Sequence, residues 1–156
     1  MSKLKSKNEL QKYMLDCVSG IFDTPSQTDI DSVFSTSAKV SSLIDILNYK
    51  LKVNKIREIT VGIGAAWGRA LMVKAGYKGS GINEVIWMGN VVNEASKLAS
   101  YGNRENYDKE IMVSTAFHYN LNEANKKLLE LNTIRNCYHG NVINTAMDAW
   151  YQQNCK

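Results

Sequence analysis

The amino-acid sequence predicts a single α+β domain, a sandwich in which helices pack on a mainly antiparallel sheet. Its 156 residues can enclose one hydrophobic core, and 44% of them are hydrophobic, an ordinary share for a globular domain. Short apolar stretches with strand character alternate with stretches of helical periodicity, and glycine-rich or polar turns separate them. We therefore treat residues 1–156 as one domain.

Strands are expected where short apolar runs are bounded by turn residues. The first expected strands form a pair that meets in a tight turn near Asp16 and ends before Pro25. In chain order, the expected strands are residues 13–22, which contain that pair, 58–64, 69–75, 83–89, 110–114 and 134–139.

Helices are expected where apolar residues recur at three- and four-residue spacing. The longest begins at a cap formed by Thr28 or Asp29, and Ser114 is placed to cap a short helix. Met147 and Trp150 are expected in the core. The expected helices are residues 28–53, 90–101, the short helix after Ser114, 122–131 and 146–151.

The composition narrows the classes of function. Nineteen Lys and Arg against 15 Asp and Glu give a formal charge of +4, without a basic stripe interleaved with aromatic residues. This charge suits a phosphate-bearing small ligand and argues against nucleic acid. No stretch approaches the roughly 20 apolar residues of a membrane span. The three cysteines form no C-x-x-C pair, which argues against a zinc cluster and favours a reducing, cytoplasmic setting.

The helix expected at residues 90–101 has an unusual polar side. Its apolar residues fall on one side, whereas Asn90, Asn93 and Lys97 fall on the other at i, i+3 and i+7. Asparagine has a low helix propensity for a merely solvated face. The first-turn amides and the positive end of the helix dipole attract anions, and Lys97 can hold a phosphate. A capping role for Asn90 and a surface role for Lys97 remain the alternatives.

Three motifs resemble the catalytic domain of class III nucleotidyl cyclases. GNVVNEASK (89–97) stands where that family has G-D-T-V-N-x-A-x-R between a strand and a helix. TVGIGAAWGRALMVKAG (60–76) resembles the R-I-G-I-H-x-G strand and the strand after it, and LDCVSGIF (15–22) resembles the G-D-x-x-x-x-x-F hairpin. The motifs occur in the family's order, from about Lys12 to Ser114. The resemblance implies a ferredoxin-like α+β sandwich.

The resemblance also implies roles for individual residues. Asp16 would bind Mg²⁺ or Mn²⁺, Asn93 would hold the ribose or the transition state, and Lys97 would replace the arginine that steadies the α-phosphate. Lys12 and Asn90 would occupy the two positions that read the base. Because class III sites form between two subunits, a homodimer is implied as well.

Where the sequence departs from the general family pattern, it resembles a narrower group of cyclases. The departures are Lys97, Asn90, GYKGSG (76–81), IWMGNVVNEASKLA (86–99) and YHGNVINTAMDAW (138–150), which look like the bacterial pyrimidine nucleotide cyclases of Pycsar anti-phage systems. That resemblance implies conversion of UTP or CTP to the 3′,5′-cyclic monophosphate, a messenger in antiviral defence. An adenylate or guanylate cyclase is the alternative substrate class, and Asn90 argues mildly against adenine.

One expected part of the family's site has no counterpart before Asp16. The first metal-binding aspartate of class III cyclases lies on an opening strand followed by two helices, and only 15 residues precede Asp16. The expectation is a shortened domain that lacks these elements. Asp23, Asp29 and Asp31 are expected to cap a turn and a helix rather than to bind metal. A catalytically silent cyclase-homology module, which binds a nucleotide or a partner, is the alternative from outside enzymes.

Overall fold

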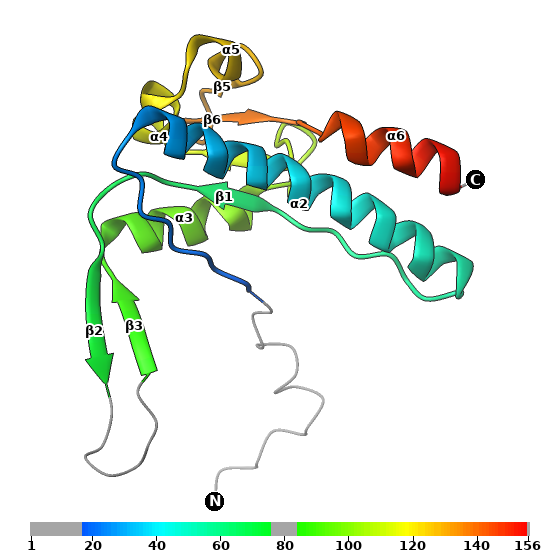
Figure 1. Cartoon of the computed structure of the whole chain (residues 1–156), viewed down its shortest axis with the longest axis horizontal. Coiled ribbons are helices and arrows are strands. Elements are labelled where there is room, and N and C mark those ends of the chain that lie inside the picture. The colour runs from blue at the N-terminus through cyan, green and yellow to red at the C-terminus, as the bar shows by residue number, and fades with distance from the viewer. Residues whose placement is uncertain (1–16, 76–83, 156) are drawn as a thin grey trace, which may run out of the picture.

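The computed structural model describes residues 17–75 and 84–155 (Figure 1). Its helices are α2 (Gln27–Val53), α3 (Asn90–Tyr101), α4 (Thr115–Asn120), α5 (Glu123–Lys126) and α6 (Thr145–Asn154). Its strands are β1 (Ile63–Ala65), β2 (Leu71–Ala75), β3 (Glu84–Met88), β4 (Ile111–Val113), β5 (Glu130–Asn132) and β6 (Cys137–Gly140). None of the helices in these two ranges has the length and apolar character needed to cross a bilayer.

The main sheet has four strands in the order β1-β4-β6-β5. Strand β1 runs parallel to β4, with Ile63 opposite Ile111, whereas β4 and β6, and β5 and β6, pair antiparallel. Strands β2 and β3 form a separate antiparallel hairpin that extends away from the body (Figure 1). The α+β class is therefore confirmed, but the main sheet is mixed because its edge strand β1 is parallel to its neighbour.

Helices cover both faces of the main sheet. Along a strand, successive side chains point to opposite faces. Ile111 and Val113 of β4 accordingly pack in one cluster with Ile30 and Phe34 of α2. Met112, between them, packs in a second cluster with Leu98 of α3 and Cys137 of β6. Helix α2 and helix α3 thus lie on opposite faces, with the sheet between them.

The cap of helix α2 lies two to three residues earlier than the sequence indicates. Its N-cap is Ser26 rather than Thr28 or Asp29, and the Asp29 carboxylate accepts a hydrogen bond from the Ser26 backbone N–H at 2.9 Å. Capping is the expected role of Asp29. Asp31 instead accepts hydrogen bonds from the Asn122 N–H and the Asn125 amide, at 3.1 and 2.8 Å. This carboxylate ties α2 to the start of α5.

Two expectations about strands and helices are wrong. Residues 17–22 are not in a strand: Val18, Ile21 and Phe22 are at least 44% exposed, because apolar composition makes a strand only where an edge is available to pair. The helix expected at 122–131 ends at Lys126, and Glu130–Asn132 pair with β6 instead. Pairing with a neighbouring strand outweighs the helical pattern of that segment.

Helix α6 is longer than expected and less buried. It packs on α2, where the Asn144 N–H donates to Ser42 Oγ at 2.8 Å and the rings of Tyr49 and Tyr151 meet edge to face. Trp150 remains 47% exposed and Met147 is only half-buried, so the expectation that they belong to the core is wrong. Where α6 packs on α2, an open apolar pocket of about 420 Å³ remains, and these two residues line it with Ile46 and Ala146.

Candidate active site on helix α3

Helix α3 spans Asn90–Tyr101, the range that the sequence predicts. It begins directly after β3, at Gly89, whose φ of 142° lies in the region that favours glycine. Gly89 supplies no side-chain cap, and the first turn of α3 contains no acidic residue. Within the described residues, the positive end of the helix dipole is therefore not neutralised at this turn.

The polar and apolar sides of α3 separate as the spacing predicts. Leu98 is buried and Val91, Val92, Ala95 and Ala99 are half-buried. Asn90, Asn93 and Lys97 are all exposed, and their i, i+3, i+7 spacing places them along one side of the helix. The structure thus brings these three side chains to one exposed surface that begins at the helix N-terminus, while their chemical roles stay predictions.

Lys97 carries a positive charge that no carboxylate compensates in the described part of the chain. None of the ion pairs between described residues includes it. Lys97 Nζ lies instead over the ring of Tyr101, one turn further along α3, at 5.9 Å from the ring centroid. A lysine in this state is available to an anionic ligand on the exposed side of α3.

Two glycines of the β1 region determine how closely α3 approaches the sheet. A Cβ atom at Gly64 would lie 2.2 Å from the carbonyl oxygen of Ala95 and 2.3 Å from the nitrogen of Ala99. A Cβ at Gly62 would lie 2.2 Å from the carbonyl oxygen of Ala99. Alternate strand residues share a face, so the G-x-G spacing presents backbone alone to the helix. The sequence contained this signal, but we did not predict the contact from it.

A polar cluster lies beyond the C-terminal end of α3. Arg135 contacts the carboxylate of Asp108 through Nη2 at 2.8 Å and Nε at 3.2 Å, and the Asn132 amide donates to Asp108 Oδ1 at 3.2 Å. The Arg135 guanidinium holds the pKa of Asp108 below its usual value, against the opposing effect of burial. Sequence reasoning missed this cluster because nothing local connects a loop residue with an arginine far along the chain.

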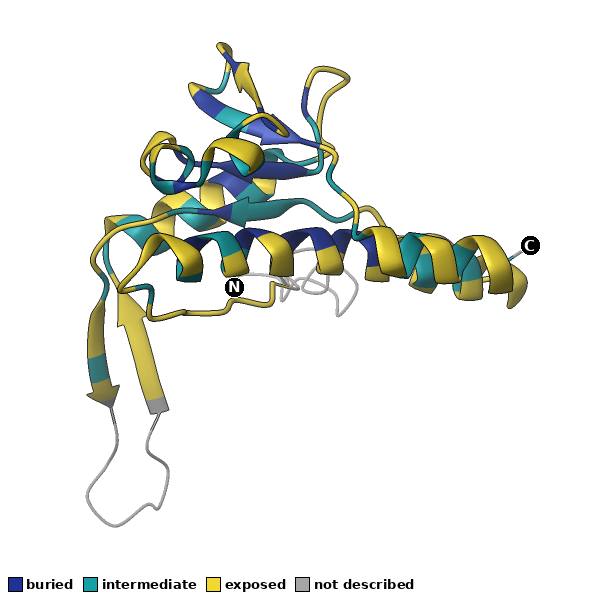
Figure 2. Ribbon diagram, turned by 45° about the horizontal axis from the view of Figure 1, so that its top comes forward, coloured by how far each residue is buried: buried dark blue, intermediate teal, exposed yellow. Residues whose placement is uncertain are grey.

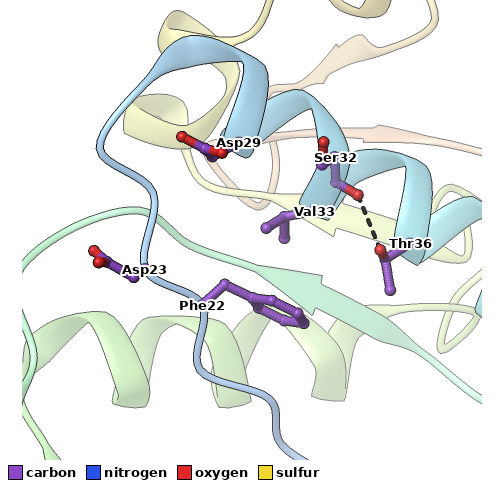
Figure 3. Close-up of a pocket in the computed structure, with 6 residues that line it drawn as sticks. All are labelled: Phe22, Asp23, Asp29, Ser32, Val33 and Thr36. Carbon is purple, nitrogen blue, oxygen red and sulfur yellow. Dashed lines mark hydrogen bonds between the residues drawn. The ribbon is translucent and has the colours of Figure 1, made fainter.

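Two of the five predicted site residues fall outside the described residues. Lys12 and Asp16 belong to residues 1–16, and the GYKGSG turn belongs to residues 76–83, so the structure places none of them. The described chain begins just after Asp16, and its next residues reach helix α2. Phe22 and Asp23 line a pocket of about 300 Å³ with Asp29 and with Ser32, Val33 and Thr36 of α2 (Figure 3).

The carboxylates around this pocket do not form a metal site by themselves. The Asp29 carboxylate accepts a hydrogen bond from the Ser26 backbone N–H. The Asp31 carboxylate accepts one from the backbone N–H of Asn122, the N-cap of α5. In the ranges 17–75 and 84–155, no three His, Cys, Asp or Glu side chains are grouped so that they could hold a metal ion. Asp16, the metal ligand that the sequence predicts, lies outside these ranges.

Comparison with known proteins gives the class of enzyme to which the chain is similar. Both curated relatives bear the name uridylate cyclase, and the predicted closeness to pyrimidine nucleotide cyclases is confirmed.

The relative from Treponema porcinum is 41% identical over 114 residues, which cover 73% of this chain and 40% of that protein. The relative from Gulbenkiania mobilis is 32% identical over an alignment of 156 positions, which covers 89% of this chain and 60% of that protein. The chain thus spans about half the length of these relatives. No protein-family model matches it, and no solved structure matches it.

Proposed function

We propose that this chain carries part or all of the catalytic region of a pyrimidine nucleotide cyclase that converts UTP to 3′,5′-cyclic UMP and pyrophosphate. The observation that carries the proposal is the 41% identity with a protein named uridylate cyclase. The exposed row of Asn90, Asn93 and Lys97 supports it, because it offers amides and a cation on one surface. CTP is the alternative pyrimidine substrate.

The proposed reaction places charge where α3 can stabilise it. The ribose 3′-oxygen gives its proton to water and forms a bond to the α-phosphorus, while the bond from that phosphorus to the bridging oxygen breaks and pyrophosphate leaves. The Lys97 ammonium would offset the negative charge that develops on the α-phosphoryl oxygens. Asn93 would hydrogen-bond the ribose, and Asn90 and Lys12 would bind the base.

A divalent metal belongs to this proposal through Asp16. Mg²⁺ or Mn²⁺ held by a carboxylate would lower the pKa of the 3′-hydroxyl and offset charge on the phosphates. Asp29 and Asp31 already have other partners, because they accept hydrogen bonds that cap or join helices. Asp16→Asn should therefore remove metal-dependent activity, and it should weaken Mn²⁺ binding measured by calorimetry.

We propose that the chain forms a homodimer through the β2–β3 hairpin. Consecutive residues on both strands are exposed, so both faces of the hairpin are open (Figure 2). An isolated two-stranded hairpin is at best marginally stable in water, and an apolar one favours a partner. Its exposed apolar residues are Leu71, Met72, Val85, Ile86, Trp87 and Met88.

Light scattering tests the dimer. The wild-type chain should have the mass of two chains at micromolar concentration, and Trp87→Glu should have the mass of one chain. Trp150→Glu, at an exposed tryptophan on α6, is the matched control and should leave the mass of the dimer unchanged. A monomeric wild-type chain would refute the proposed assembly.

Activity is tested by incubating the purified chain with Mn²⁺ and each of the four nucleoside triphosphates, with products resolved by mass spectrometry. Cyclic UMP that disappears with Asp16→Ala, and falls roughly 100-fold or more with Lys97→Ala, would support the proposal. Lys39→Ala, at an exposed lysine of α2, is the matched control. Cyclic CMP as the product would identify CTP rather than UTP as the substrate. Cyclic AMP or cyclic GMP would identify a purine nucleotide cyclase instead. Nucleotide binding without any product would indicate the silent module.

The cellular role that we propose is a cytoplasmic messenger synthase in bacterial defence against phages. Its support is the resemblance of residues 86–99 and 138–150 to the Pycsar enzymes. Cells that carry the gene should accumulate the cyclic nucleotide after infection and should resist the phage. Two results would contradict this role: cells with the Lys97→Ala gene that still accumulate the cyclic nucleotide, or cells that resist the phage without making any cyclic nucleotide.

A further inference from the structure

The ring of Tyr101, the last residue of α3, lies close to two cations. Lys97 Nζ is 5.9 Å from the ring centroid, and the guanidinium carbon of Arg135 is 4.2 Å from it. Lys97 is on the exposed side of the helix, whereas Arg135 belongs to the polar cluster beyond the helix end. Tyr101 therefore connects the proposed phosphate-binding lysine with that cluster.

Arg135 is held in one orientation. Two of its nitrogens contact the two oxygens of Asp108, a carboxylate whose side chain has no exposed surface. The backbone N–H of Arg135 donates to Asn132 Oδ1 at 3.0 Å, and the Asn132 side-chain amide in turn donates to Asp108 Oδ1. A planar guanidinium with both ends of its fork engaged offers a fixed surface on which an aromatic ring can stack.

The Tyr101 ring is fixed from the core side as well. It packs against the cluster of Leu98, Met112 and Cys137 on the α3 face of the sheet. With the core on one side and the Arg135 guanidinium stacked close by, the ring has a defined position relative to α3. Because the charge of Arg135 is compensated by Asp108, the ring can still attract the ammonium of Lys97.

We propose that Tyr101 is a positioning residue for Lys97, and that the Asp108–Arg135 pair holds its ring for this task. A lysine side chain on a helix surface samples many rotamers, and ordering it at the moment of reaction costs free energy. Contact with a fixed ring one turn away restricts the ammonium to the region above α3. This inference rests on the proposed function for its kinetic consequence, but not for the contact itself.

The contact can be measured without any activity. In the wild-type chain labelled with ¹³C-lysine, the Lys97 side-chain methylene protons next to Nζ, assigned with Lys97→Arg, should show an upfield ring-current shift relative to exposed Lys39. The shift should disappear in Tyr101→Met and persist in Tyr101→Phe. An unshifted Lys97 signal in the wild-type chain would overturn the proposal even if every variant failed to fold.

The kinetic test compares kcat and KM for the nucleotide substrate. Tyr101→Met, which fills the volume without a ring face, should lower kcat about twofold to fivefold, the range of a cation–π contact at an exposed site. KM should change less than kcat, and Tyr101→Phe should restore kcat. A folded Tyr101→Met variant with wild-type kcat would overturn the proposal.

The chain offers a matched control at the same kind of contact. Lys126 Nζ lies 5.6 Å from the ring centroid of Tyr119 on α4, and α4 packs with the core cluster on the other face of the sheet. Tyr119→Met should leave kcat unchanged. If the wild-type chain makes no product, the proposed function fails while the ring-current measurement still decides whether Tyr101 positions Lys97.

Discussion

Strands β4 and β3 contain the same kinds of apolar residue but have opposite surroundings. Ile111, Met112 and Val113 of β4 have no exposed surface, whereas Val85, Ile86 and Met88 of β3 are 44–54% exposed. Strand β4 lies between two other strands and has helices on both of its faces, whereas β3 pairs with β2 in a two-stranded sheet and its residues 85–88 remain exposed. Two strands of similar apolar composition thus end in different surroundings, and the number of layers that cover each strand decides whether its side chains are buried or exposed.

The largest expected effect comes from truncating the same residue type in both regions. Ile111→Ala should lower the free energy of unfolding by about 2–5 kcal/mol, because its cavity is enclosed on every side. Ile86→Ala should cost less than about 1 kcal/mol in the isolated chain, since water already reaches that side chain. Urea unfolding at a concentration where the chain is monomeric measures both. Equal losses would mean that the hairpin is as buried as the body.

A smaller effect is expected from adding one methyl group where α3 meets the sheet. Gly64→Ala should destabilise the chain by about 1–3 kcal/mol, because its Cβ would collide with the backbone of Ala95 and Ala99. Gly68→Ala is the matched control at the loop that leads to the hairpin, where the nearest atom, Val91 Cβ, would be 3.4 Å away. Thermal unfolding of the two variants should separate them by several degrees. A neutral Gly64→Ala would show that α3 can shift freely.

Acidic pH should weaken the body through Asp108. Its pKa in the folded state lies below 3.8, the ordinary value for an aspartate, mainly because Arg135 donates hydrogen bonds to the carboxylate. The stabilisation is therefore fully present above pH 3.8 and is lost as pH falls through the folded-state pKa. Arg135→Gln should flatten this part of the stability profile, and Arg69→Gln, at an exposed residue before the hairpin, should not. Identical slopes would exclude Asp108 as the source.

The smallest expected effect is a decrease in stability through His139 as pH falls below 6.5. Its folded-state pKa is lowered, first by burial, which outweighs the nearby Glu130. The Lys109 N–H and the Asn132 amide both face Nδ1, at 3.2 and 3.3 Å, so a proton there would oppose two donors. The contribution of His139 is present above pH 6.5 and is lost below it. His139→Gln should remove that dependence in denaturant titrations between pH 5 and 7.5.

The sequence predicted elements best where periodicity and end signals agree. The range Asn90–Tyr101 and the cap at Ser114, which accepts the Phe117 N–H, follow from local patterns that the structure retains. Residues 17–22 form no strand, and the helix expected at 122–131 ends at Lys126, because strand pairing depends on which edge is available. The expectation that Trp150 is buried was also wrong, since α6 packs on α2 in a way that leaves this side chain 47% exposed.

The candidate site also has features that local sequence spacing predicts and features that depend on tertiary contacts. Helical spacing alone places Asn90, Asn93 and Lys97 on one side of α3, because 3.6 residues per turn is a local property of the backbone. The setting of that side depends on contacts between distant segments: Gly62 and Gly64 against α3, and Asp108 with Arg135 against Tyr101. The sequence by itself determined which residues share the exposed face. Only the tertiary structure decided how close the helix lies to the sheet and what holds its end, since both depend on packing between residues far apart in the chain.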